Sequence, residues 1–418
     1  MTLRLLAPFL FCVLSTLPEG YGRIIPANPA NYLQLAAKLR AGDTLALAPG
    51  KYLRGLPLRN LRGAARSPIV IRGAGEKTIL LGRSGSNTMD ISDCSYVEIR
   101  NLTFDGRNIR NIDAIKAGGG SGGVHHLTIE GNLIRGHGGT QQTCGISTKV
   151  TAWDWIIRGN VVIGAGTGLY LGNSNGEQPF IRGLVEGNLV KNPKGYCMQI
   201  KRQNRRPLDL RGIPREDART IVRNNVFIKD DRVGESGLRP NLLVGAFPPQ
   251  GLGSRDLYEI HGNVLWHNHR ESLFQGTGRI SLHDNLFVDA RQNAIRIMSH
   301  HGRPPELVRI YHNTFVGVKR PISATDIKNA SALIQFGNLH ADAMGRGILR
   351  NPAIAFGKLD PRPVRAIREN TSSAFFRAVR QDSAHAYDFF GNPKPNSLSY
   401  QGACAPGGAK GHPIQERK

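Results

Sequence analysis

Cysteine is scarce in this chain, which has 5 among its 418 residues. No two of them show the CxxC spacing of a zinc site, so a thiolate metal centre is not predicted. Cys94, Cys144 and Cys197 each lie beside an alternating apolar segment that is typical of a strand. We therefore expect thiols packed in a core, with disulfides as the less favoured alternative.

Long apolar runs are equally scarce, since the sequence has only one, at its N-terminus. Residues 1–4 supply a positive start, residues 5–17 form the run, and Gly20 and Gly22 precede a cleavage point at Arg23. The run is too short to cross a bilayer. We predict a signal peptide over residues 1–22, a secreted or periplasmic protein and no membrane span. A buried N-terminal helix is the alternative.

Acidic residues are too few to balance the basic ones. Lysine and arginine total 55 against 31 aspartates and glutamates, which gives a formal net charge of +24. Such a charge favours a polyanionic partner, either nucleic acid or an acidic polysaccharide. Export favours the polysaccharide and argues against nucleic acid. A charge that serves solubility alone is the alternative.

A short pattern recurs along the chain: an apolar residue, a variable one, a small or polar one, asparagine, and another apolar residue. The asparagines are Asn101, Asn132, Asn160, Asn188, Asn225, Asn263, Asn285, Asn313 and Asn338. Short alternating strands that repeat every twenty to forty residues indicate a β-solenoid, whose coils bury their apolar faces on one another. Asparagine tolerates a left-handed corner, and its stacked amides can form a ladder of hydrogen bonds. We predict an all-β, right-handed parallel β-helix.

The ends of the repeat suggest where the domain stops. Residues 32–40 are predicted to form an N-terminal capping helix, because a solenoid must cover its open core. We expect the β-helix over residues 23–345 and a C-terminal segment, residues 346–402, that packs back on it. The Gly-, Pro- and Lys-rich residues 403–418 are expected to form a flexible tail.

Several segments resemble a known family, the pectate-lyase-like β-helix proteins, and in particular their chondroitinase-B and alginate-lyase branch. The resemblance covers residues 24–340, and residues 388–395 look like the closing segment of bacterial β-helix proteins. It implies the same fold and a polysaccharide-related activity. The segments that carry it are residues 41–44 with 49–52, residues 67–73 and residues 95–104.

A second strand in each coil predicts an outward row of polar side chains. Alternation buries Ile146, Leu169 and Met198 and turns their neighbours outward. Insertions at residues 202–219, 230–240 and 246–256 flank this row, and long loops on a rigid scaffold favour binding and catalysis. The outward residues are Lys116, Ser147, Lys149, Tyr170, Gln199, Lys201 and Arg296. We predict that substrate is bound by Lys116, Lys149, Gln199, Arg202, Arg205 and Arg206.

Uronate polymers are usually cut by β-elimination, in which a base removes the proton beside a neutralised carboxylate. Reprotonation on the other face gives epimerisation instead. Lys201 lies among cations that lower an amine pKa, so it is the predicted base, with His300 and His301 as competitors. Tyr170 is the predicted proton donor. Arg296 or Arg239 would hold the carboxylate.

The family comparison supports Lys201 as the catalytic lysine of such lyases. The two calcium-binding glutamates of that family correspond to Cys197 and Gln199, so calcium is not supported and no cofactor is expected. The family's partner arginine would fall near Val244 and Gly245, and Arg239 is the nearest candidate. We expect a monomeric polysaccharide lyase or C5-epimerase. A non-catalytic glycan-binding or adhesin-like protein and a glycoside hydrolase remain alternatives, the latter with Asp90 or residues 230–231 as acids.

Overall fold

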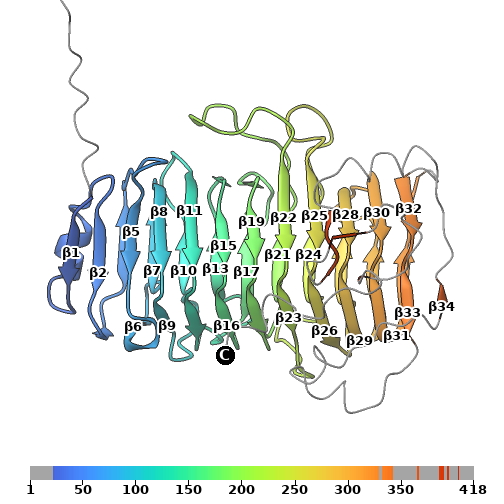
Figure 1. Ribbon diagram of the computed structural model, residues 1–418, viewed down its shortest axis with the longest axis horizontal. Helices are drawn as coiled ribbons and strands as arrows, with labels where there is room; N and C mark the ends of the chain where they lie inside the picture. The colour runs from blue at the N-terminus through green and yellow to red at the C-terminus, as the bar shows by residue number, and fades with distance from the viewer. Residues whose placement is uncertain are drawn as a thin grey trace, which may run out of the picture.

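The computed structural model describes residues 22–328, 332–341, 365–366, 386–389, 393–394 and 403. Residues 1–21 of the predicted signal peptide lie outside the described residues, and so do nearly all of the C-terminal segment and tail. Within the described part, the chain winds into stacked coils along one axis (Figure 1). No helix in that part is long and apolar enough to cross a membrane.

Each regular coil contributes a strand to each of three parallel faces, which are named here in chain order. The first face is continuous from end to end, and the short strands β14 (Ala152–Trp153) and β18 (Phe180–Ile181) extend it at one edge. Its strands are β1 (Ile24–Ala27), β2 (Thr44–Leu47), β5 (Ile69–Arg72), β8 (Ser95–Arg100), β11 (Val124–Glu130), β15 (Ile156–Arg158), β19 (Leu184–Glu186), β22 (Arg219–Arg223), β25 (Leu257–His261), β28 (Arg279–His283), β30 (Leu307–Tyr311) and β32 (Leu333–Phe336).

The second and third faces merge where two long strands turn the corner between them, at β29 (Leu286–Ile297) and β31 (Thr314–Ala324). The second face also holds β3 (Gly50–Tyr52), β6 (Thr78–Leu81), β9 (Thr103–Asp105), β12 (Leu133–Arg135), β16 (Val161–Ile163), β20 (Leu189–Lys191), β23 (Val226–Ile228), β26 (Val264–Asn268) and β33 (Leu339–Ala341), with β34 (Arg365–Ala366) antiparallel to β33. The third face holds β4 (Leu56–Arg59), β7 (Met89–Ser92), β10 (Ile115–Ala117), β13 (Cys144–Thr148), β17 (Thr167–Leu171), β21 (Met198–Ile200), β24 (Leu242–Val244) and β27 (Phe274–Gly276).

Alternation along the strands builds one core that runs through the coils. In β8, for example, every second side chain is buried and the others are partly exposed. Burying an aliphatic side chain contributes about 1.5–3 kcal/mol, and each coil obtains this only by stacking on its neighbours. Cys94, Cys144 and Cys197 are free and buried, as predicted from their positions beside strands; Cys404 lies outside the described residues. The predicted parallel β-helix is confirmed.

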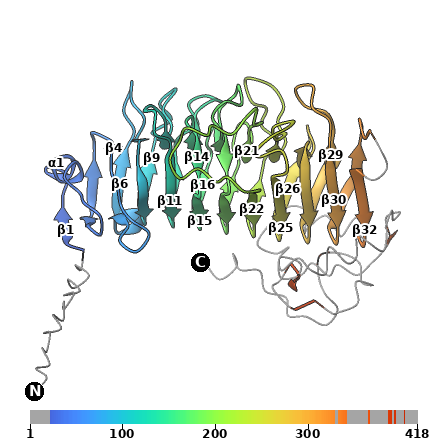
Figure 2. The same ribbon diagram turned by 90° about the horizontal axis from the view of Figure 1, so that it is seen from above.

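The N-terminal helix is shorter than expected. The structure has α1 only over Tyr32–Ala36, followed by a turn, where the sequence predicted residues 32–40. Tyr32 is buried, and its hydroxyl donates a hydrogen bond to the carbonyl of Gly55. The helix lies at the N-terminal end of the stack (Figure 2). Its role as a cap stays a prediction.

The predicted asparagine ladder is present and buried, with two corrections. The Oδ1 atom of Asn160 accepts hydrogen bonds from both the backbone and the side-chain nitrogen of Asn132, at 3.0 Å each. The same pair of bonds recurs at each step from Asn160 to Asn338. Asn101 is not a member, because Leu102 occupies the ladder position beside Asn132.

The left-handed corner residue is the one before each ladder asparagine. These residues have φ between +49° and +65°, and Asn101 occupies the same position with φ +53°. They are Gly131, Gly159, Gly187, Asn224, Gly262, Asp284, His312 and Gly337. The ladder asparagines themselves are therefore selected for their amides and not for a left-handed backbone.

Replacing Asn188 with leucine should destabilise the β-helix by about 1–3 kcal/mol, because buried polar groups on both neighbouring coils lose their partners. Thermal melting of Asn188→Leu against the parent measures this. Asn175→Leu is the matched control, since Asn175 is exposed in a loop and should change stability by less than about 0.5 kcal/mol. Equal melting of Asn188→Leu and the parent would contradict the structural role of the ladder.

Candidate functional site

The row of outward side chains predicted on the third face is in register. Lys116 pairs with Ser147, Ser147 with Tyr170, and Tyr170 with Gln199. The row then continues through Leu243 and Gln275 to Arg296. Neighbouring members are about 4.8 Å apart, as the spacing of paired strands requires. Ser147, Tyr170, Gln199 and Leu243 are nonetheless buried, so the row is covered along its middle and partly exposed toward its ends.

A loop after β23, residues 229–240, covers one side of the row. The backbone nitrogen of Ser236 donates to Gln141 Oε1 at 2.7 Å, and Lys194 pairs with Glu235 at 2.8 Å. The loop thus reaches back over coils that precede its own in the chain. It places the Arg239 guanidinium 5.7 Å from the ring centroid of Tyr196, next to β21.

The connections that precede β22 and β25 flank the other side of the row and project beyond the neighbouring turns (Figure 1). Both are tied down by arginines. Arg206 forms a buried ion pair with Asp256 and donates to the carbonyls of Pro214 and Glu216. Arg303 donates to the carbonyls of Gln203 and Phe247 at 2.8 and 2.6 Å. The predicted insertions are therefore ordered segments fastened to the scaffold.

Two of the predicted substrate-binding arginines differ in their exposure to solvent. Arg206 was expected to bind substrate, but its side chain is only 1% exposed and its guanidinium contacts protein groups, so its role is structural. Arg205 is 77% exposed and pairs with Glu177 at 3.0 Å. Arg205 keeps access to solvent, and with it the predicted role in binding.

Two lysines share the ring of Tyr170. The Nζ atom of Lys149 lies 3.0 Å from the ring centroid and that of Lys201 lies 5.4 Å from it. Burial, together with Lys116 and Lys201 nearby, lowers the pKa of Lys149 to about 8. Burial and then Arg202 and Arg239 lower the pKa of Lys201. Burial raises the pKa of Tyr170 to about 12, so the phenol stays protonated at neutral pH. The site thus combines two amines suited to accept a proton with a hydroxyl suited to donate one.

The two predicted histidines lie within electrostatic reach of Lys201. The rings of His300 and His301 are 4.3 Å apart. Burial, His301 and then Lys201 lower the pKa of His300 to about 4, and burial followed by Arg202 and Lys201 lowers that of His301. Both rings are therefore neutral at neutral pH and within electrostatic reach of Lys201. Each could act as a hydrogen-bond donor or a weak base.

Arg296 does not join this cluster. It is three pairings away from Gln199 along the row, a separation of about 14 Å at the strand spacing. An arginine there would contact a different part of an extended ligand. Arg239 lies over Tyr196, next to β21, and its charge lowers the pKa of Lys201, so of the two arginines predicted to hold the carboxylate Arg239 is nearer to the amine.

The coil after Lys201 cannot supply the arginine that the family resemblance implied. Gly245 follows β24 and donates its backbone hydrogen bond to Ile200. A Cβ atom on Gly245 would stand 2.4 Å from the backbone nitrogen of Arg202, so a larger residue does not fit. Cys197, at one of the two glutamate positions of the family, is buried, and its Sγ atom lies 3.7 Å from the carbonyl oxygen of Ile228.

Asp113 is a buried carboxylate at the start of the row, and the sequence pattern did not indicate it. Its oxygens accept hydrogen bonds from the Cys144 backbone nitrogen and the Ser147 hydroxyl, both at 2.7 Å. Its charge acts to raise the pKa of Lys149, against the effect of burial. Asp113 precedes β10 in an irregular segment, so no alternation marked it as part of the site.

Comparisons with known proteins support the fold. No family model matches this chain, and no curated protein does. Pectate lyase Pel9A is similar in structure over 94% of this chain and 96% of its own, with a TM-score of 0.53 and 10% identity. An alginate lyase from Paenibacillus sp. str. FPU-7 aligns over 77% of this chain and 93% of its own, with a TM-score of 0.45 and 16% identity. A GH136 lacto-N-biosidase from Eubacterium ramulus aligns over 72% and 67%, with a TM-score of 0.43 and 12% identity. The chain has a pectate-lyase-like parallel β-helix fold.

Proposed function

We propose that this protein is a secreted or periplasmic enzyme that acts on an acidic, uronate-containing polysaccharide, as a lyase or a C5-epimerase. The observation that carries the proposal is that the side-chain amines of Lys149 and Lys201 both lie over the ring of Tyr170. Tyr170 in turn belongs to the in-register row on the third face. Both amine pKa values are lowered, and cations that suit a carboxylate lie beside them.

In this mechanism the cations Arg202 and Arg239 bind the uronate carboxylate, which acidifies the proton on the neighbouring carbon. The Lys201 amine takes that proton. Tyr170, held protonated by burial, donates its proton to the departing glycosidic oxygen and completes the β-elimination. If a proton instead returns to the opposite face of the carbanion, the product is the epimer and the chain is not cut.

The length of the row suits a polymer. From Lys116 to Arg296 the row takes six pairing steps, about 29 Å at the strand spacing. Cationic side chains stand at both ends and in the middle, and the whole chain carries a net charge of +24. An extended polyanion can contact all of these charges at once, whereas a small metabolite cannot.

Binding without catalysis is the second candidate. The observation that favours it is Gly245, which leaves no room for a partner arginine beside Lys201 on the scaffold itself.

A hydrolase is less well supported, because Asp113 is held by two hydrogen bonds and Asp90 accepts one from Asn87. Incubation with a panel of polyuronates separates these functions: unsaturated products indicate a lyase, inverted uronates an epimerase, and retention without change a binding protein.

Binding to an acidic polysaccharide should weaken steeply as salt rises from about 0.02 M to 0.15 M, because screening shortens the reach of exposed charges to about 8 Å. Affinity electrophoresis in gels that contain polygalacturonate or alginate measures this. Cellulose derivatives without charge are the control and should cause no retardation at either salt concentration. Equal retardation by neutral and acidic polymers would contradict the role of the basic charge.

A further inference from the structure

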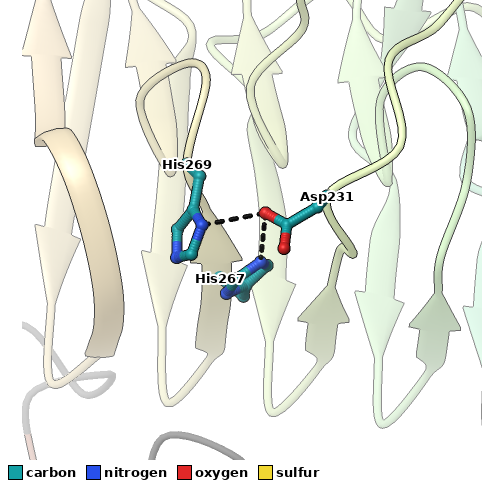
Figure 3. A group of neighbouring side chains, drawn as sticks. All are labelled: Asp231, His267 and His269. Carbon is teal, nitrogen blue, oxygen red and sulfur yellow. Dashed lines mark hydrogen bonds and ion pairs between the residues drawn. The ribbon is translucent and has the colours of Figure 1, made fainter.

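A cluster of two histidines and two aspartates lies away from the row, on the second face. His267 is in β26, His269 follows that strand, and Asp231 comes from the loop of residues 229–240 (Figure 3). The Oδ1 atom of Asp231 is 3.2 Å from His267 Nε2 and 2.8 Å from His269 Nδ1. One oxygen and two ring nitrogens, each from a different residue, therefore converge within 4.8 Å of one another.

Asp289, on the neighbouring strand β29, completes the arrangement. It accepts a hydrogen bond from His267 Nδ1 at 2.6 Å, on the opposite side of the ring from Nε2. In metal sites a histidine ligand commonly donates its second ring N–H to a carboxylate, which fixes the tautomer and the ring orientation. Asp289 holds His267 in just this way, with Nε2 directed at Asp231 and His269.

We propose that Asp231, His267 and His269 bind a zinc ion, or a similar borderline transition metal, with Asp289 orienting His267. The ligand atoms are Asp231 Oδ1, His267 Nε2 and His269 Nδ1, and water fills the fourth position. Two imidazoles with one carboxylate suit zinc, whereas calcium and magnesium prefer sites made of oxygen.

The charges of the cluster favour a bound cation. The two imidazole rings are 3.9 Å apart, close enough for both to bind one ion. As ligands both imidazoles are neutral, and the carboxylates of Asp231 and Asp289 then contribute a charge of −2, which a divalent ion balances. Asp231 is 68% exposed, while His267 and His269 are 16% and 20% exposed. An ion can thus enter from solvent and be held against the scaffold.

Zinc binding is expected to fix the loop of residues 229–240 to the β-helix. Asp231 and Arg239 belong to the same loop, and Arg239 lies beside Tyr196 and Lys201. Zinc would tie one end of this loop to β26, at the coil that follows it. The proposal concerns metal binding and loop order, so it is independent of the activity proposed for the row.

Calorimetric titration of the untagged, full-length protein with Zn²⁺ tests the site. One equivalent should bind, and His267→Gln combined with His269→Gln should abolish that binding. Asp289→Asn should weaken it about 10–100-fold, as loss of an orienting carboxylate does. Asp230→Asn is the matched control for Asp231→Asn, because it removes the same charge from the adjacent position of the loop. Asp231→Asn should weaken binding at least tenfold, and Asp230→Asn should leave it unchanged.

Two measurements on the parent protein guard against variants that fail to fold. Bound Co²⁺ should give the visible spectrum of a nitrogen and oxygen site without thiolate charge-transfer bands. Zn²⁺ should also slow tryptic cleavage after Arg232, whose side chain is 62% exposed in the loop. Unchanged Zn²⁺ affinity in the folded double histidine variant, thiolate bands with Co²⁺, or cleavage at the same rate with and without Zn²⁺ would each overturn the proposal.

Discussion

Lys201→Ala is expected to lower the rate at saturating polyuronate by about 10²–10⁴-fold, the usual contribution of a general base. Affinity should change little, because Arg202, Arg239 and Lys149 still contact the acidic chain. Lys201→Arg should lose as much activity, since a guanidinium stays protonated and cannot accept the proton. Lys191→Ala is the control: Lys191 is exposed on β20 of the second face and should keep full activity.

Lys149 is the rival base, and the two lysines give different results. If Lys149 took the proton, kcat/KM would rise with pH to a plateau above about pH 8, the pKa of its amine, and would fall as Lys149 became protonated below it. Lys149→Ala would then abolish turnover while Lys201→Arg stayed active. Rates for both alanine variants and for Lys201→Arg decide between them. An active Lys201→Arg enzyme would contradict the assignment of Lys201.

Arg206→Ala is expected to have the largest effect on stability, about 3–5 kcal/mol, because it leaves the Asp256 carboxylate buried without its partner. The loss should appear as local opening of residues 206–218, since Arg206 also holds the carbonyls of Pro214 and Glu216. Hydrogen exchange of that segment measures the opening free energy. Arg205→Ala is the matched control: it removes the same charge one position earlier from an exposed pair worth at most about 1 kcal/mol.

A second variant separates the buried charge from the loss of packing. Arg206→Met combined with Asp256→Leu removes both charges and should recover part of the stability lost in Arg206→Ala. Recovery should be incomplete, because the backbone groups of Pro214, Glu216 and Ala218 lose their side-chain partners. If Arg206→Ala and Arg205→Ala opened equally, the structural role of Arg206 would be wrong and binding would again be its best explanation.

The sequence could predict the fold because the repeat is a local property. Each coil carries its own alternation and its own asparagine, so stacking in register follows from the pattern without knowledge of distant contacts. The same alternation predicted the row on the third face, including Tyr170, Gln199 and Arg296. The asparagine repeat was assigned one position too early at Asn101. The physical cause is that asparagine fits both the ladder position and the left-handed position before it.

What the sequence by itself determined about this protein is therefore the β-helix, its ladder and the alignment of the row on the third face. The tertiary structure alone decided which loop side chains reach that row, because loops have no period and their contacts join residues far apart in the chain. It buried Arg206 on Asp256, placed Arg239 near Lys201 and separated Arg296 from it. It also brought Asp231 to His267 and His269, which are 36 and 38 positions away. These three side chains lie close together because of the path that the loop takes over the coils.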